Sequence, residues 1–517
     1  SAQIKRLKQA RVSDEPVIVI NQREAEKNEK SRSKKFKTWR YKAKNVRDFA
    51  FTSSRKFIWD AMGVRLGNRT IMAMSYYPKE ANPLYETYST RAVAHTVRVY
   101  SKYTFDYPYP VAISVEANNG MEYPMICFNY GRPEKDGTYS ERIKYGMISV
   151  IIHEVGHNYF PMIVNSDERQ WTWMDEGLNS YLQFLTEQEW DREYPSRRGP
   201  PQNIVNYMKG NKNNLTPIMT NSESIYLFGN NAYGKPATAL NILRETIVGR
   251  ELFDFAFKEY SKTWMFKHPT PSDFFRILEN ASAVDLDWFW RGWFYGTDPV
   301  DLSIDRVTWY TIDSKNPEVE FPLRKQKKDE EPIQTWQERN EIDIQETVVE
   351  TDEIANDFYN KFDPYEVTIL DKEEFIRYRD SSVVEPREKE IYNSNLNYYE
   401  IKFSNVGGLV MPIILQLNYK DSTDYIIKIP AEIWKMNRNQ ITKIFATKKQ
   451  VISFTLDPRL ETADIDLVNN HWPRKMIQSK FELYKSKNYN RGTTSKENKM
   501  QRKIRADKKL EETNNKD

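Results

Sequence analysis

Cysteine and histidine are scarce in this chain of 517 residues, which contains 1 Cys and 5 His. A single cysteine, Cys127, cannot close a disulfide within the chain, so a fold held together by internal disulfides is excluded. No apolar run approaches the roughly 18 residues of a membrane-spanning helix. The longest candidate, 409–417, is interrupted by Pro412 and Gln416. We therefore expect no transmembrane segment.

Neither sign of charge dominates, because 77 Lys and Arg stand against 73 Asp and Glu. This small balance gives no reason to expect a nucleic-acid partner. The basic stretches at 30–37 and from Lys485 onward lack apolar periodicity, and we interpret both as solvated linkers or tails. The chain length predicts about three domains.

The N-terminal region, residues 1–82, has short β-type runs at 17–20, 46–51 and 70–77, separated by turn residues and charge clusters. We expect it to be a partial β-domain with a basic linker. From residue 83 to 300 the apolar period becomes helical, which predicts a mostly helical domain. The expected helices are 90–103, 145–159, 175–190, 237–248 and 272–279, and the expected strands are 111–115 and 125–130.

After residue 300, apolar and polar residues alternate with a period of two, as in β-strands. This pattern predicts a β-sandwich domain over 301–473. Within it, residues 313–395 carry many charges and few apolar side chains, so we expect an extended or mobile insertion. Residues 474–517 form a basic tail that we expect to be disordered. The predicted fold class is therefore multidomain α+β.

A metal-binding pattern lies in the expected helix at 145–159. His153 and His157 are four residues apart, so both imidazoles can point from one helix face to one metal ion. Glu154 lies about 100° around the helix, where it can reach a metal-bound water without binding the metal. The alternative is a buried helix whose histidines are only hydrogen-bonded in the core.

Glu176 provides the third ligand in our interpretation. Catalytic zinc keeps three protein ligands and one open position. Because Glu176 opens a second expected helix, we predict one Zn²⁺ per chain, bound by His153, His157 and Glu176. The alternative is that Asp175 and Glu176 merely favour a helix N-terminus through its dipole.

These motifs resemble the gluzincin zinc aminopeptidase family, which includes aminopeptidase N and the leukotriene hydrolase. The segment HEVGH, then eighteen residues, then Glu176 in DEGLNSY follows the family's metal-binding pattern. Upstream, NGMEYP at 119–124 is similar to the family's G-x-M-E-N exopeptidase motif. The resemblance implies a thermolysin-like catalytic domain over 83–300. Only 119 residues precede Gly120, so we expect the family's N-terminal β-domain to be incomplete here.

The resemblance implies that Glu122 binds the free α-amino group of a peptide, so that only the first residue is removed. Gly120 and Met121 belong to the same substrate-binding segment, whereas Tyr123 replaces the family's asparagine. Alternatively, Glu122 is a solvated residue in a turn. The GMEYP form of the motif suggests a bacterial cell-envelope or secreted protein.

Tyr233 lies in a stretch similar to the family's Y-x-K-G pattern, with Pro236 in place of glycine. It is implied to hydrogen-bond the oxyanion, with Tyr226 as the reserve candidate and a packing role as the alternative. In the expected mechanism Glu154 takes a proton from the zinc-activated water and then protonates the leaving amine. Two other functions stay open: a zinc endopeptidase of the same superfamily, and an inactive peptidase-fold binding or scaffold protein.

Overall fold

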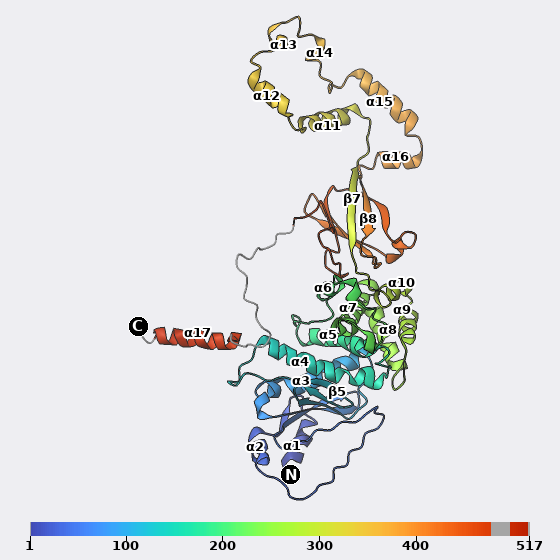
Figure 1. The fold of residues 1–517 in the computed structure, drawn as a ribbon. Coiled ribbons are helices and arrows are strands. Elements are labelled where there is room, and N and C mark those ends of the chain that lie inside the picture. Colours follow the sequence, from blue (N-terminus) through green and yellow to red (C-terminus); the bar gives the residue numbers. More distant parts are fainter. Residues whose placement is uncertain (1, 477–496, 515–517) are drawn as a thin grey trace.

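The computed structural model describes residues 2–476 and 497–514. The chain combines many helices with three sheets, running from an N-terminal sheet through a helical body to a β-rich C-terminal part (Figure 1). This architecture confirms the prediction of a multidomain chain that mixes helices and strands. Within the described ranges, no helix is both long and apolar enough to cross a membrane.

A six-stranded sheet forms the N-terminal part, with strand order β1-β2-β3-β4-β6-β5. β3 pairs in parallel with β4 and β4 with β6, whereas the other neighbours are antiparallel. The domain boundary expected at residue 82 lies between β3 and β4, two neighbouring strands of this one sheet. The strands are β1 (Val17–Ile20), β2 (Ile58–Leu66), β3 (Arg69–Tyr77), β4 (Val111–Glu116), β5 (Gly120–Tyr123) and β6 (Ile126–Asn129).

Two long helices pack near this sheet, α3 (Leu84–Tyr103) and α4 (Glu141–Gly156). Ser140 caps α4, because its hydroxyl accepts a hydrogen bond from the backbone N–H of Ile143 at 3.2 Å. The inward face of α4 follows the helical period, and its buried apolar residues are Met147, Ile148, Ile151, Ile152 and Val155. These residues hold the two histidines at the C-terminal end of α4 in the interior.

The rest of the helical body is built from short elements between residues 158 and 293. They are η2 (Asn158–Ile163), η3 (Trp173–Gly177), α5 (Leu178–Trp190), η4 (Pro201–Asn203), α6 (Val205–Met208), η5 (Lys212–Asn214), η6 (Ser222–Ser224), η7 (Gly229–Gly234), α7 (Lys235–Ile242), η8 (Leu243–Ile247), α8 (Arg250–Thr263), α9 (Pro271–Ser282) and α10 (Asp287–Trp293). All five expected helices are present. However, those at 175–190 and 237–248 each combine an α-helix with a wider turn.

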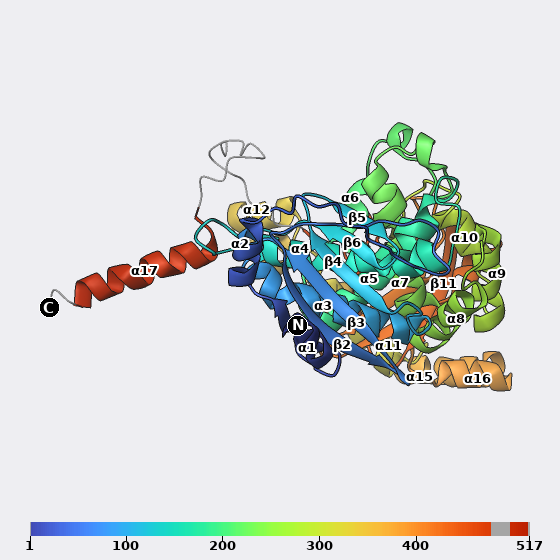
Figure 2. The same cartoon turned by 90° about the horizontal axis from the view of Figure 1, so that it is seen from below.

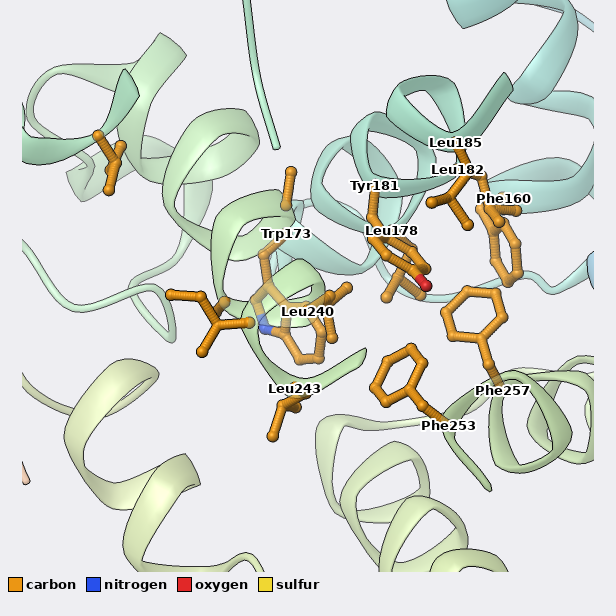
Figure 3. Packing of buried hydrophobic residues seen from close by; sticks show 14 of the residues in the cluster. Phe160, Trp173, Leu178, Tyr181, Leu182, Leu185, Leu240, Leu243, Phe253 and Phe257 are labelled. Carbon is orange, nitrogen blue, oxygen red and sulfur yellow. The ribbon is translucent and has the colours of Figure 1, made fainter. Parts of the chain in front are cut away.

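Large aromatic side chains form the centre of this body (Figure 3). Tyr181 of α5 contacts the rings of Phe253 and Phe257 on α8, at centroid distances of 5.7 and 5.4 Å. Trp173 is fully buried and stacks on Phe275 of α9 at 5.8 Å. This packing fixes η3, which carries Glu176, and the start of α5 that follows it.

The prediction of a strand at 46–51 is wrong. Residues 30–57 contain no strand, and side chains rather than ladder hydrogen bonds hold the segment to the body. Tyr109 donates a hydrogen bond to the carbonyl of Asn45 at 2.7 Å, and Arg47 pairs with Glu168 at 3.2 Å. Helices α1 (Ala2–Ala10) and α2 (Gln22–Glu29) were also not expected in this region.

The C-terminal part contains a three-stranded sheet, order β11-β8-β7, and a four-stranded sheet, order β10-β9-β12-β13. A short turn, η9 (Ala431–Trp434), lies between β10 and β11. The strands are β7 (Leu302–Tyr310), β8 (Asn397–Asn405), β9 (Ile413–Tyr419), β10 (Asp424–Ile429), β11 (Gln440–Thr447), β12 (Val451–Leu456) and β13 (His471–Trp472).

The charged insertion between β7 and β8 is helical and projects from the far end of the molecule (Figure 1). Its helices are exposed, since apart from Pro317 none has a buried residue, which fits the low apolar content. They are α11 (Pro317–Asp329), α12 (Thr335–Asp343), α13 (Val348–Thr351), α14 (Phe358–Lys361), α15 (Ile369–Ser382) and α16 (Pro386–Tyr392).

The C-terminal tail is partly helical, which corrects the expectation of disorder for the described residues. α17 (Lys499–Asn514) projects away from the body in both views (Figures 1 and 2), and the good helix formers Lys, Arg, Gln and Glu explain its conformation. Lys499 pairs with Glu141 of α4 at 2.8 Å. Residues 477–496 and 515–517 of the tail lie outside the described residues.

Candidate metal centre

Three wide, π-type turns position the candidate site residues. The first, η2, follows α4 directly, where Pro161 cannot donate a backbone hydrogen bond and the carbonyl of Phe160 turns toward His157. Glu176 lies on the second turn, η3, and Tyr233 on the third, η7. Such turns are frequent at functional sites, since they change the direction of a side chain within a helix.

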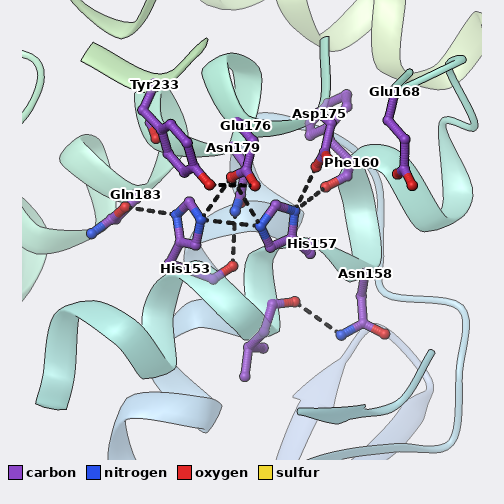
Figure 4. Close-up of polar contacts among 12 residues, drawn as sticks. His153, His157, Asn158, Phe160, Glu168, Asp175, Glu176, Asn179, Gln183 and Tyr233 are labelled. Carbon is purple, nitrogen blue, oxygen red and sulfur yellow. Dashed lines mark hydrogen bonds and ion pairs between the residues drawn. The ribbon is translucent and has the colours of Figure 1, made fainter. Parts of the chain in front are cut away.

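The side chains of His153, His157 and Glu176 converge (Figure 4). Nε2 of His153 lies 3.0 Å from Nε2 of His157 and 3.0 Å from Oε2 of Glu176. Nε2 of His157 lies 3.4 Å from the same carboxylate oxygen. The three residues predicted to be ligands are thus brought to one point, with their donor atoms within 4.8 Å of one another.

The outer nitrogen of each imidazole is held by an acceptor. Nδ1 of His153 lies 2.9 Å from Oε1 of Gln183, whose amide nitrogen donates to Glu187. Nδ1 of His157 donates to the carbonyl of Phe160 at 2.9 Å and lies 2.9 Å from the buried Asp175. These contacts place the protons on Nδ1 and leave Nε2 of each neutral ring to bind a metal.

This donor set fits zinc. Ligands bonded to tetrahedral zinc at 2.0–2.2 Å lie roughly 3.3 Å apart, close to the spacings of 3.0 to 3.4 Å observed here. Burial disfavours the protonated imidazole of His157 and lowers its pKa. The carboxylates of Asp175 and Glu176 outweigh this effect and raise the pKa of His157 well above its ordinary value. The three side chains therefore attract positive charge, which a metal cation would supply.

Glu154 lies beside this centre without joining it. Burial raises the pKa of Glu154 to about 9, His157 opposes the shift, and the nearby carboxylates of Glu122 and Glu176 add to it. Its Oε2 atom is buried without a hydrogen-bond partner. A Cβ atom at Gly120 would lie only 2.6 Å from Oε1 of Glu154, so edge strand β5 passes this carboxylate closely because residue 120 has no side chain.

Glu122 on β5 is half-buried, and its carboxylate reaches the same centre. An oxygen of Glu122 lies within 4.8 Å of donor atoms of His157 and Asp175. The charge of Glu122 also acts on Asp48, an exposed residue of the N-terminal segment: partial desolvation raises the pKa of Asp48, Arg47 opposes the shift, and Glu122 adds to it. Sequence reasoning missed Asp48, because it lies in a segment we read as a strand of a remote domain.

Tyr233 donates a hydrogen bond from its hydroxyl to Oε1 of Glu176 at 2.7 Å. Its ring stacks on His153 with centroids 5.8 Å apart. By contrast, the reserve candidate Tyr226 is 61% exposed, so the structure brings only Tyr233 to the centre. Of the remaining predicted residues, Met121 is 38% exposed on the edge strand, and Tyr123 packs against the ring of Phe128.

Gly156 on α4 permits close contact with α5. A Cβ atom there would lie 2.3 Å from both the hydroxyl of Tyr100 and Oδ1 of Asn179. Asn179 also donates to the carbonyl of His153 at 2.8 Å. We expect Gly156→Ala to lower the free energy of unfolding by about 1–3 kcal/mol, because overpacking forces these groups apart. Denaturant unfolding checks this value; an unchanged midpoint would contradict such tight packing.

Comparison with known proteins gives a family match over the part of the chain that holds these residues. Residues 88–293 match the Peptidase family M1 domain. Glutamyl aminopeptidase of Sus scrofa is 29% identical over 145 residues, which are 27% of this chain and 15% of that protein. The matched region therefore spans only a small part of this relative's length.

Solved structures give further matches. Legionella pneumophila aminopeptidase A in complex with aspartic acid aligns with a TM-score of 0.47 and 13% identity, covering 79% of this chain and 38% of that chain. The M1 zinc metallopeptidase of Deinococcus radiodurans aligns with a TM-score of 0.36 and 20% identity, covering 47% of this chain and 52% of that chain.

Proposed function

We propose that this chain, whose residues 88–293 match the Peptidase family M1 domain, is a zinc-dependent aminopeptidase that removes the N-terminal residue of peptides. One observation carries the proposal: His153, His157 and Glu176 converge within 3.0 to 3.4 Å beside the buried Glu154. A centre of two histidines and one glutamate leaves one coordination position for water or substrate. The surrounding helices then form the thermolysin-like catalytic domain implied by the resemblance.

The chemistry divides among these residues. Zinc, when bound by these three ligands, acidifies water and polarises a carbonyl. Glu154 acts as the general base that takes up the water's proton and returns it to the leaving amine. A cation at the centre favours the charged carboxylate and so opposes the effect of burial on its pKa. In the reaction, the hydroxyl of Tyr233 would donate its hydrogen bond to the oxyanion instead of to Glu176. Such a hydrogen bond is worth about 2.7–4 kcal/mol in other oxyanion sites.

Selectivity for a free N-terminus comes from Glu122, and Asp48, on which the charge of Glu122 acts, is proposed as a second carboxylate of this anchor. An ammonium group placed between two carboxylates forms charge-assisted hydrogen bonds with both. It also relieves the repulsion between them. Because this anchor lies beside the metal centre, only the first peptide bond reaches the reacting position. Gly120 and Met121 then border the substrate's first residue.

The test compares an alanyl anilide with its N-acetylated form. We expect the free-amino substrate to be hydrolysed and the acetylated one to be inert, because acetylation removes the ammonium charge. Glu122→Gln should raise KM for the free-amino substrate by about tenfold or more, since hydrogen bonds to charged groups are the strong ones. Glu373→Gln, which changes an exposed glutamate on α15 of the insertion, is the matched control and should leave KM unchanged.

Two other results of this test would each indicate a different function. Hydrolysis of acetylated peptides at the same rate would identify an endopeptidase. Retention of zinc with no hydrolysis of any free-amino substrate would identify a binding or scaffold protein. Either result would overturn the aminopeptidase proposal.

A further inference from the structure

A cavity of about 650 Å³ adjoins the metal centre. His153, Glu154 and Tyr233 line one end of it. The rest of its wall comes from the first turns of α4, from α5 and from the loop after α5. None of the β5 residues that border the amine anchor lines this cavity.

The two sides of the metal centre therefore differ. Glu122, which fixes the amino end of the substrate if the proposed function holds, is not among the residues that line the cavity. Because the scissile bond lies at the metal, the part of the peptide after that bond must extend away from the anchor. The cavity beyond Glu154 and Tyr233 is where this leaving part would enter.

Three arginines line the cavity: Arg142, Arg197 and Arg198. Arg198 lies nearest the reacting end, with its guanidinium carbon 4.1 Å from the centroid of the Tyr233 ring. Its one hydrogen bond to a side chain is a long one, to the hydroxyl of Ser180 at 3.4 Å. Within residues 2–476 and 497–514, none of the three arginines forms an ion pair with a carboxylate.

Apart from Glu154, the proposed general base, the two acidic residues of the cavity, Glu141 and Glu187, already have partners. The buried carboxylate of Glu187 accepts hydrogen bonds from Ser149 at 2.7 Å and Gln183 at 2.8 Å. Glu141 pairs with Lys499 at 2.8 Å. Burial lowers the pKa of Arg198, although the nearby Tyr233, Glu176 and Glu187 oppose this shift. The cavity thus offers, beside the metal centre, arginine side chains that form no ion pair with a carboxylate among the described residues.

We propose that Arg198, supported by Arg142 and Arg197, binds a carboxylate on the leaving part of the substrate. Arginine suits this role because its planar guanidinium binds a carboxylate through two parallel hydrogen bonds. The carboxylate has two possible sources: the C-terminus of a dipeptide, or an Asp or Glu side chain in the second position. Arg198 is then a specificity-determining residue for the proposed reaction.

Four substrates with the same first residue test this inference: alanyl-alanine, alanyl-alanine amide, alanyl-glutamate amide and alanyl 4-nitroanilide. The first carries only the terminal carboxylate, the third only the side-chain carboxylate, and the other two carry none. We expect Arg198→Gln to raise KM about tenfold or more for a carboxylate-bearing substrate and to leave the amide and the anilide unchanged. The dipeptide or the glutamate amide, whichever responds, identifies the source. Arg198→Lys should restore part of the loss.

The matched control is Arg192→Gln, an exposed arginine of the same loop outside the cavity. Equal loss on all four substrates in Arg198→Gln would show a structural effect through Tyr233 and would overturn the inference. No change on any of them would overturn it as well. If the wild-type protein hydrolyses none of the four, the proposed function itself fails, and this result is distinct from both.

Discussion

Replacing Glu154 by glutamine should lower kcat by about 10³-fold, within the usual range for loss of a general acid-base group. Glutamine keeps the size of the side chain but cannot take up a proton. Because Glu154 is not one of the three converging donors, the variant should keep its zinc. Steady-state kinetics on an alanyl anilide and metal analysis of the same sample measure both effects.

Glu193→Gln serves as the control, since Glu193 is an exposed glutamate remote from the centre. Its kcat and zinc content should equal those of the wild type. Undiminished turnover by Glu154→Gln would remove this residue from the mechanism. Loss of zinc from the same variant would instead place Glu154 among the metal ligands.

Replacing His157 by glutamine should abolish both metal binding and activity. Changing only the outer partners of metal ligands typically costs 10–100-fold in affinity, so removal of a ligand should exceed about 10²-fold. The side chain of His157 is 1% exposed, and its Nε2 atom lies at the meeting point of the three donors. Zinc content after dialysis should therefore fall well below one ion per chain.

The matched control is His268→Gln. His268 is exposed and contacts only Asn165 among the described residues, so metal content and activity should not change. Circular dichroism of both variants shows whether they remain folded. A His157→Gln protein that is folded and still retains one zinc per chain would contradict the assigned ligand set.

The sequence predicts the helix of the two histidines from its apolar period, although its start at Glu141, capped by Ser140, was not predicted. The spacing of His153 and His157 on that helix needs no tertiary information. The wide turns at Phe160, Glu176 and Tyr233 were not foreseen, because their shape depends on packing rather than on local propensity. Glu122 was expected from its motif, but its strand at the sheet edge was not.

Residues that meet only through the tertiary fold gave no signal. Asp48 lies 74 positions before Glu122 in a segment without regular structure, and only the fold brings it within the influence of the charge of Glu122. Arg198 reads in the sequence as part of a plain charged loop, and its unpaired charge beside Tyr233 is visible only in the structure. From composition we expected the insertion to be extended or mobile and the tail that contains α17 to be disordered, since exposed helices of this kind bury almost no apolar surface.

A crystal structure with anomalous diffraction at the zinc absorption edge tests the central claim most directly. The account predicts one strong peak per chain, in contact with Nε2 of His153, Nε2 of His157 and a carboxylate oxygen of Glu176. A zinc-loaded crystal with no peak between these three side chains, or with its only peak elsewhere, would contradict the account.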